Sequence, residues 1–308
     1  MRRILVTAIS GDIANGILKI LKSKEEILYG CDVNDVAVGM DLVSVFWKSK
    51  YAVEDGYVEQ VIQKCIQYDI KYVIPVNERE IEVIGKRREE FETLKIKLLI
   101  QKQEILNIFL DKYNTYEKLC KIGIKVPATY TEKQMILDVS KKYICKPRKS
   151  NGSKDIFMYD FSDRKLQKTS DYVIQEYIEG DKEYTVGVFR QGRRINTIAF
   201  RRKLKNGYSN QVELVNIEAI NHIAEKIAVA FDVEGYINIQ MREYMGQFYI
   251  FEVNPRISGT VRFRHMLGFS DVLWWLKLLD GEKIESYKVP YKKAIGVREL
   301  NEKFLILE

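Results

Sequence analysis

Histidine, cysteine motifs and long apolar runs are scarce in this chain, and each scarcity argues against a class of function. The 308 residues include only 2 histidines and no defensible Ser-His-Asp or Cys-His arrangement, so covalent catalysis by a protein nucleophile is not favoured. The four cysteines lack CxxC or CxxH spacing, and we expect buried free thiols, as suits a reducing cytosol, at Cys31, Cys65, Cys120 and Cys145. No stretch approaches the roughly 20 apolar residues of a membrane helix.

Proline is also rare, and neither sign of charge gathers into blocks. With 5 prolines, 46% hydrophobic residues and no low-complexity tract, the chain is expected to be globular throughout. The apolar run after the two N-terminal arginines has about six residues, too short for a signal peptide. The net charge of +7 arises from interspersed charges and fits a small polyanionic ligand, or a lysine-rich proteome, at least as well as a nucleic acid. We expect a cytoplasmic protein with neither a membrane nor a nucleic-acid partner.

The pattern along the chain predicts two domains. Residues 1 to about 100 alternate short apolar runs with helical patterns, which predicts a Rossmann-like parallel sheet with crossover helices. The loop SGDIANG lacks GxGxxG spacing, so dinucleotide binding is not favoured there. After about residue 101 we expect helices over 103–109 and 112–122, antiparallel strands from 143 to 200, and an amphipathic helix over 217–231. The predicted fold class is thus α/β and α+β.

The most informative segment is YIFEVNPRISGT, residues 249–260. Glu252 and Asn254 are two residues apart on a predicted strand, so they project from one face while Phe251 and Val253 point into a core. A turn around Gly246 would bring Gln240, on the preceding strand, opposite Glu252. Three oxygen donors on neighbouring strands suit Mg²⁺, which takes one or two carboxylates and leaves other positions to water and phosphate. An ordinary amphipathic hairpin would show the same alternation, so the upstream motifs are needed to distinguish it from a metal site.

Two upstream segments carry lysines that could meet phosphate. Lys112 precedes a helix that ends at Gly123 and is stopped by Pro127. Lys146 ends a predicted strand and would supply a compact positive charge. It runs into a small polar loop whose backbone amides can approach phosphate oxygens, formed by Ser150, Asn151, Gly152 and Ser153. A solvated helix end and a plain hairpin turn are the alternatives.

A connector, YVIQEYIEGDKEYTV, and an arginine complete the set. Exposed backbone from Glu176 through Tyr177 to Ile178 can pair with the edge of adenine, and Glu183 can accept from ribose hydroxyls, although an acidic loop is often only solvated. Arg256 follows Asn254 and can clamp a phosphoryl group with two parallel hydrogen bonds.

In order and spacing, these motifs resemble the ATP-grasp superfamily, specifically its carbamoyl-phosphate-synthase-like branch, across roughly residues 101–280. The resemblance implies a two-lobed ATP-grasp domain at 101–308, with a small lobe at about 112–185 and a C-terminal lobe at about 186–308. The domain at 1–100 resembles the one that precedes it in this family. Gln240 stands where many members have an acidic ligand, although the branch named here also uses glutamine.

Carried over by residue, the resemblance implies roles for each motif. Lys112 and Lys146 would contact ATP phosphates, the backbone of Glu176 and Ile178 would hold adenine, and Glu183 would bind ribose. The magnesium ions, or Mn²⁺ in their place, would be held by Gln240, Glu252 and Asn254. Arg256 would steady the transferred phosphoryl group, which makes Arg256 and Lys146 the expected catalytic residues.

The implied activity is a ligase that activates a small-molecule carboxylate as an acyl phosphate and joins it to an amine. Such transfer asks mainly for positioning and charge neutralisation. Candidate substrate contacts are Arg201, Arg202, Arg262, Arg264 and His265. A small-molecule phosphotransferase, a nicotinamide-dependent oxidoreductase and a nucleotide-binding protein without turnover remain alternatives. A homodimer is a further expectation.

Overall fold

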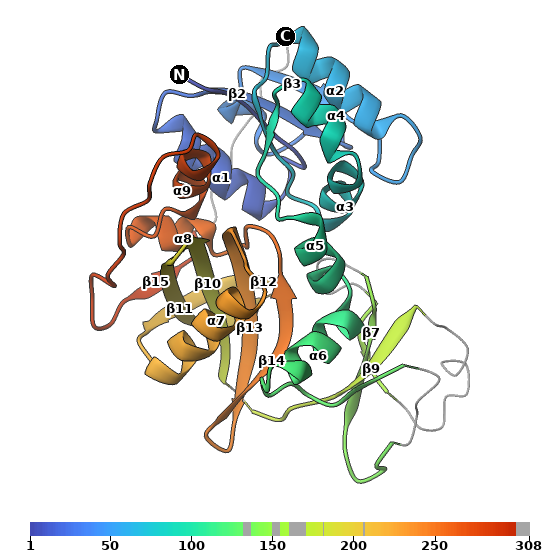
Figure 1. The fold of residues 1–308 in the computed structure, drawn as a ribbon, viewed down its shortest axis with the longest axis vertical. Coiled ribbons are helices and arrows are strands. Elements are labelled where there is room, and N and C mark those ends of the chain that lie inside the picture. Colours follow the sequence, from blue (N-terminus) through green and yellow to red (C-terminus); the bar gives the residue numbers. More distant parts are fainter. Residues whose placement is uncertain (132–136, 150–154, 160–170, 181, 206, 300–308) are drawn as a thin grey trace.

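The computed structural model describes residues 1–131, 137–149, 155–159, 171–180, 182–205 and 207–299, and these residues form three sheets (Figure 1). The first sheet belongs to the N-terminal hundred residues, at the top of the figure. The other two lie below it and are joined to it by helices α5 and α6. The mixed fold class with one parallel and two antiparallel sheets is therefore confirmed.

The first sheet has five parallel strands, as the alternating pattern predicts. Their order is β3-β2-β1-β4-β5. The bounds are β1 (Arg3–Val6), β2 (Ile27–Asp32), β3 (Val45–Lys48), β4 (Tyr72–Ile74) and β5 (Lys97–Leu98). Because the order reverses between β1 and β4, the chain leaves the carboxyl ends of these neighbours in opposite directions, which is where open α/β sheets place ligands.

Helices cover both faces of this sheet, because successive side chains of a strand point to opposite sides. Ile4 and Val6 join a core with α1 (Asp12–Lys22), whereas Leu5 joins a core with the helices on the other face. Those helices are α2 (Tyr57–Gln67), α3 (Glu78–Lys86) and α4 (Arg88–Thr93). A short 3₁₀ helix, η1, spans Met40–Leu42.

The second sheet is small and antiparallel, in the order β6-β9-β7-β8. Helices α5 (Gln103–Phe109) and α6 (Lys112–Lys121) precede it, close to their predicted bounds. Its strands are β6 (Thr129–Tyr130), β7 (Tyr143–Pro147), β8 (Phe157–Met158) and β9 (Tyr172–Glu176). Helix α5 contributes Ile105 to one core and Leu106 to another, so it packs on both sides of the predicted boundary. A domain boundary near residue 100 stays a proposal.

The third sheet has six antiparallel strands in the order β14-β13-β10-β11-β12-β15. These are β10 (Lys182–Gln191), β11 (Arg194–Lys205), β12 (Tyr208–Val215), β13 (Gly235–Tyr244), β14 (Gln247–Asn254) and β15 (Ile295–Val297). Helix α7 (Glu218–Ala230) buries its apolar stripe on one face. Helices α8 (Val261–Met266) and α9 (Asp271–Leu279) share a core with the other face and with α1, so they connect this sheet to the first one.

Two further predictions concern the state of the cysteines and the presence of membrane-spanning helices. All four cysteines are free thiols, and Cys31, Cys65 and Cys145 are buried, but Cys120 is exposed near the end of α6, so its predicted burial is wrong. Among the described helices, none combines the length and apolar character needed to cross a bilayer.

Candidate nucleotide and metal site

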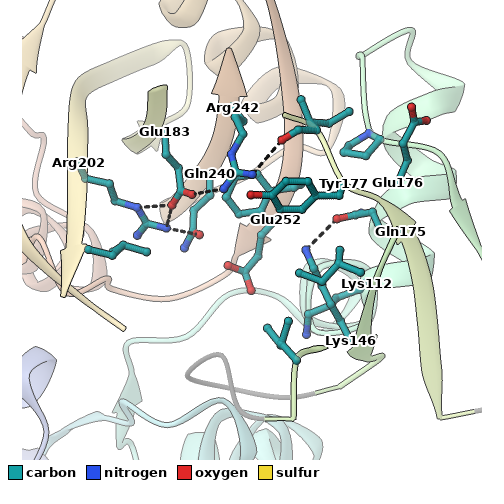
Figure 2. Close-up of a pocket in the computed structure, with 16 residues that line it drawn as sticks. Lys112, Lys146, Gln175, Glu176, Tyr177, Glu183, Arg202, Gln240, Arg242 and Glu252 are labelled. Carbon is teal, nitrogen blue, oxygen red and sulfur yellow. Dashed lines mark hydrogen bonds and ion pairs between the residues drawn. The ribbon is translucent and has the colours of Figure 1, made fainter. Parts of the chain in front are cut away.

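A cavity of about 370 Å³ lies between the small sheet and the six-stranded sheet (Figure 2). This volume falls within the range of small-molecule sites. It is lined by nine residues that the sequence nominated, namely Lys112, Lys146, Glu176, Tyr177, Ile178, Glu183, Arg202, Gln240 and Glu252. The nominated loop residues Ser150, Asn151, Gly152 and Ser153 lie outside the described residues.

The predicted pairing of β13 with β14 is confirmed. Gln240 lies opposite Glu252, and Asn238 lies opposite Asn254. A two-residue turn joins the strands, with φ of 48° at Met245 and 71° at Gly246. Two consecutive positive φ angles are the signature of the hairpin turn whose twist matches that of the strands. The turn therefore fixes the register that brings Gln240 to Glu252.

A bulge in β14 changes the direction of one side chain. Gln240 pairs with Glu252 but Met241 pairs with Ile250, which leaves Phe251 as the extra residue of β14. Ile250 and Val253 remain in the core under α7, while Phe251 and Glu252 both line the cavity. The prediction that Phe251 points into the core is wrong, because simple alternation does not hold across a bulge.

The oxygen donors near Glu252 fit a divalent cation only in part. Glu252 and Asn254 both line a small recess beside the main cavity, and they offer a carboxylate and an amide of the kind that Mg²⁺ accepts. The third nominated donor, Oε1 of Gln240, already accepts a hydrogen bond of 2.7 Å from Nη2 of Arg202. Within the described residues no group of three or more His, Cys, Asp or Glu side chains is arranged to hold a metal. A cation here would rely on phosphate oxygens for part of its coordination.

Glu183 is held between two arginines from the neighbouring strands. Arg202 of β11 donates to its Oε1 from Nε and Nη2 at 2.8 and 2.6 Å, and Arg242 of β13 donates to its Oε2 at 2.8 Å. Burial alone would raise the pKa of Glu183, but the two guanidinium groups hold it below its ordinary value. Glu183 is therefore ionised. Its contact with ribose stays a prediction. The carboxylate that would make this contact already has two cationic partners.

Lys146 and Lys112 stand across the cavity from Glu252 (Figure 2). Lys146 of β7 is buried, donates to Oε1 of Gln175 at 2.8 Å, and lies over the ring of Phe251 at 5.2 Å. Burial lowers its pKa to about 8, with Lys112 and Arg242 opposing the charge and Glu252 favouring it. Lys112 is the first residue of α6, directly after the N-cap Asp111.

The connector after β9 forms another part of the wall. The amide N–H of Glu176 donates to the carbonyl of Ala128, and its carboxylate pairs with Lys141 at 3.0 Å. The carbonyl oxygen of Ile178 accepts from Arg242 at 2.9 Å, so Ile178 would meet a base edge through its N–H. The guanidinium of Arg242 also lies 5.1 Å from the ring of Tyr177. Adenine contact by this connector stays a prediction.

Arg256 has a partner that the sequence reasoning missed. Its Nε and Nη2 donate to Oε1 of Glu78 at 3.1 and 2.8 Å, which joins the C-terminal lobe to the N-terminal sheet. Glu78 begins α3 just after β4, and burial raises its pKa while Arg256 opposes the shift. It lines the recess with Glu252 and Asn254. The available signal was its position at the carboxyl end of a strand beside the reversal of strand order.

Arg264, nominated as a substrate contact, is instead part of the core. It is 0% exposed, donates to Oδ2 of Asp271 at 3.0 and 2.5 Å, and also bonds the hydroxyls of Ser258 and Thr260. The space it fills depends on Gly187, where a Cβ would lie 2.8 Å from Cδ of Arg264. Because its donors point inward to fixed partners, substrate contact by Arg264 is not compatible with this geometry.

The other nominated basic residues lie in different places. Arg202 lines the cavity, but Arg201 points to the opposite face of β11 and pairs with Glu213, because neighbouring strand residues alternate. Arg262 is exposed on α8. His265 is half-buried, has a pKa lowered by burial, and contacts Oγ of Ser270 through Nδ1. Of this group only Arg202 reaches the cavity, so substrate contact by Arg201 or His265 is not supported there.

Comparison with known proteins explains the arrangement. Residues 109–260 match the family profile described as the ATP-grasp domain. These residues form an ATP-grasp domain. A carbamoyl phosphate synthase large chain from Methanosarcina barkeri is 45% identical over 88 residues, which is 27% of this ATP-grasp chain and 8% of the relative. A tyramine–L-glutamate ligase from Methanocaldococcus jannaschii is 24% identical over 215 residues, which is 68% of this chain and 63% of that protein.

Solved structures extend the likeness to the whole ATP-grasp fold. N5-carboxyaminoimidazole synthetase from Staphylococcus aureus superimposes with a TM-score of 0.74 at 14% identity, over 96% of this chain and 82% of that one. At this identity the likeness establishes the fold alone. The chain spans less than two thirds of the length of either curated relative named above.

Proposed function

We propose that this ATP-grasp protein is an ATP- and magnesium-dependent ligase that activates a small carboxylate as an acyl phosphate and joins it to an amine. The observation that carries the proposal is the cavity itself. Two lysines, Lys112 and Lys146, line it together with Glu252, and Asn254 lies beside Glu252 in the adjoining recess. Cationic side chains facing oxygen ligands suit a triphosphate whose metal bridges to the protein.

In this proposal the nucleotide lies along the cavity with its base toward the connector at 176–178. Lys146 and Lys112 would neutralise phosphate charge from the wall opposite Glu252. The low pKa of Lys146, caused by burial, is expected of a cation whose counter-charge arrives with a ligand. Glu252 and Asn254 would hold Mg²⁺ or Mn²⁺, which when bound would neutralise charge on the phosphates.

Arg256 is proposed to contact the transferred phosphoryl group, and Glu78 to fix the guanidinium. Two hydrogen bonds to one carboxylate oxygen hold the plane of Arg256 beside the recess. In the reaction an oxygen of the acid substrate attacks the γ-phosphorus and ADP leaves. The amine then attacks the acyl carbon, loses a proton and displaces phosphate. The chain needs no nucleophile of its own, so its task is to position these reactants and neutralise their charge.

The names of relatives support a ligase in preference to a phosphotransferase. The tyramine–L-glutamate ligase matches over 68% of this chain, and its printed name describes the joining of an amine to an amino acid. No feature of the described residues independently favours release of a phosphorylated product.

The proposal is tested by screening ADP release with Mg-ATP against amino acids, hydroxy acids and sugar acids, each alone and paired with amines. Turnover that requires both an acid and an amine is the expected result. Substitution Glu252→Ala should lower it by about 100-fold or more, whereas the exposed Glu234→Ala should not. Turnover with one co-substrate and a stable phosphorylated product would instead establish the phosphotransferase. Unchanged turnover in Glu252→Ala would refute the metal assignment.

A further inference from the structure

The amide of Gln240 is oriented by Arg202. A guanidinium carries only hydrogen-bond donors, so the atom of Gln240 that faces Nη2 of Arg202 at 2.7 Å must be the carbonyl oxygen Oε1. That oxygen is also the one atom of the side chain that could coordinate a cation, because an amide NH₂ is not a metal ligand. The family-type metal role of Gln240 would therefore place a cation on the oxygen that already accepts a hydrogen bond from the guanidinium of Arg202.

Arg202 is fixed in this position by its strand neighbours. Glu183 of β10 lies directly across from Arg202 on β11 and from Arg242 on β13, so the three charged side chains share one face of the sheet. Arg202 makes two hydrogen bonds to Oε1 of Glu183, while the other oxygen of Glu183 binds Arg242 (Figure 2). The side chain of Arg202 is only 12% exposed. Moving Arg202 away from Gln240 would break this buried charge pairing.

A cation on Oε1 of Gln240 would sit beside the guanidinium of Arg202, and their like charges would repel in a partly buried site. The cavity already has more cationic side chains than carboxylates. Its lining contains the cations Lys112, Lys146, Arg202 and Arg242, against the carboxylates Glu176, Glu183 and Glu252. Glu176 is moreover paired with Lys141. A second divalent cation at Gln240 would have no further carboxylate in this lining and would depend on the triphosphate for its counter-charge.

We propose that this chain binds its nucleotide with a single divalent cation, held by Glu252 and Asn254, and that Arg202 supplies the charge that a second cation at Gln240 would bring. Nη1 of Arg202 has no hydrogen-bond partner among the described residues, and Arg202 lines the cavity, so it can donate to a phosphate oxygen. This inference rests on the proposed function, because it concerns the same nucleotide.

The test counts manganese ions in the complex of the full chain with a non-hydrolysable ATP analogue. Titration with Mn²⁺ followed by electron paramagnetic resonance should saturate at one ion per chain, without the broadening caused by two adjacent Mn²⁺ ions. Gln240→Leu should also bind one ion per chain. Two ions in the wild type, reduced to one in Gln240→Leu, would overturn the inference.

A matched pair of variants tests the charge role of Arg202. Arg202→Met should weaken binding of the analogue by about 10- to 100-fold, the usual range for one charge-assisted hydrogen bond. Arg201→Met, on the same strand but the opposite face, should leave it unchanged. Equal affinities in the two variants would overturn the role of Arg202. If the wild type bound neither analogue nor Mn²⁺, the proposed function would fail as well, whereas two bound ions with normal turnover would refute only this inference.

Discussion

Arg264 and Lys146 are both cations withdrawn from solvent, but only one of them has a buried counter-charge. Arg264 is 0% exposed and is bound to the carboxylate of Asp271, to two hydroxyls, and to the ring face of Tyr236 at 4.6 Å. Lys146 is 9% exposed and meets the neutral amide of Gln175 and the ring of Phe251. In the described part of the chain, no carboxylate lies within ion-pair distance of Lys146.

The two residues differ in where their counter-charge lies. The counter-charge of Arg264 is within the fold, whereas that of Lys146 would have to come from a ligand. Removing a charge from water costs several kcal/mol unless a partner and hydrogen bonds compensate for it. Arg264 has that compensation within the fold, so it stabilises the segment between β14 and α9. Lys146 lacks it, and burial accordingly lowers its pKa to about 8. A cation left in this state is a candidate for binding an anion such as a phosphate.

The largest effect is expected from Arg264→Met. This change leaves the carboxylate of Asp271 buried without its partner, and breaking a buried pair in this way costs about 3–5 kcal/mol. Urea unfolding followed by circular dichroism measures the loss of folding free energy. The exposed Arg262→Met, on the same helix, should change it by less than about 0.5 kcal/mol. Equal effects of the two substitutions would mean that the Arg264–Asp271 pair does not hold the core together.

Lys146→Met should have the opposite effect to Arg264→Met, because it should weaken nucleotide binding without lowering the stability of the fold. It removes a desolvated cation that no carboxylate stabilises, so the free energy of unfolding should stay the same or increase. Affinity for an ATP analogue should fall by about 1.5–3 kcal/mol, the usual loss for a hydrogen bond to a charged group. Calorimetric titration measures the affinity, with the exposed Lys142→Met as control. A destabilised variant with unchanged affinity would make Lys146 a structural residue like Arg264.

The sequence could predict which strands carry the site but not every side-chain direction on them. Alternation and the turn at Gly246 place Gln240 opposite Glu252, as the register confirms. The bulge that turns Phe251 into the cavity has no sequence signal of its own, because it depends on how β14 packs against its neighbours. The same holds for Arg201 and Arg202, where a shift of one residue decides which arginine faces the cavity.

Roles that depend on distant partners were beyond prediction. Arg264 and Arg256 are eight residues apart and look alike in the sequence. Their partners are Asp271 within the core and Glu78 from the N-terminal sheet. No local pattern distinguishes a guanidinium that will be buried from one that lies beside a recess, because burial is decided by the packing of α8 and α9 on the sheet.

The pH dependence of nucleotide affinity gives a smaller but more specific test of Lys146. Its pKa falls from 10.5 to about 8 on folding because of burial, so below pH 8 the side chain is charged and above pH 8 it is neutral. A phosphate ligand requires the charged form, so affinity should be constant below pH 8 and fall at higher pH by at most about tenfold per pH unit. Lys146→Arg, which stays charged, should remove this dependence. A wild-type affinity that is flat up to pH 10 would contradict a depressed pKa at Lys146.

The smallest effect is expected from a substitution of His265. Replacing it with asparagine removes one contact with Ser270, so the free energy of unfolding should fall by about 1 kcal/mol or less, with no change in nucleotide affinity. Burial, with Lys24 and Arg262, lowers the pKa of His265, so the unfolded chain takes up a proton at a higher pH than the folded chain does. The wild type should therefore lose stability relative to His265→Asn as pH falls below about 6.5. Urea unfolding at pH 7.5 and pH 5.5 measures the difference in free energy of unfolding between the two proteins. If the wild type were instead more stable relative to the variant at pH 5.5, His265 would be charged in the fold and have an acidic partner.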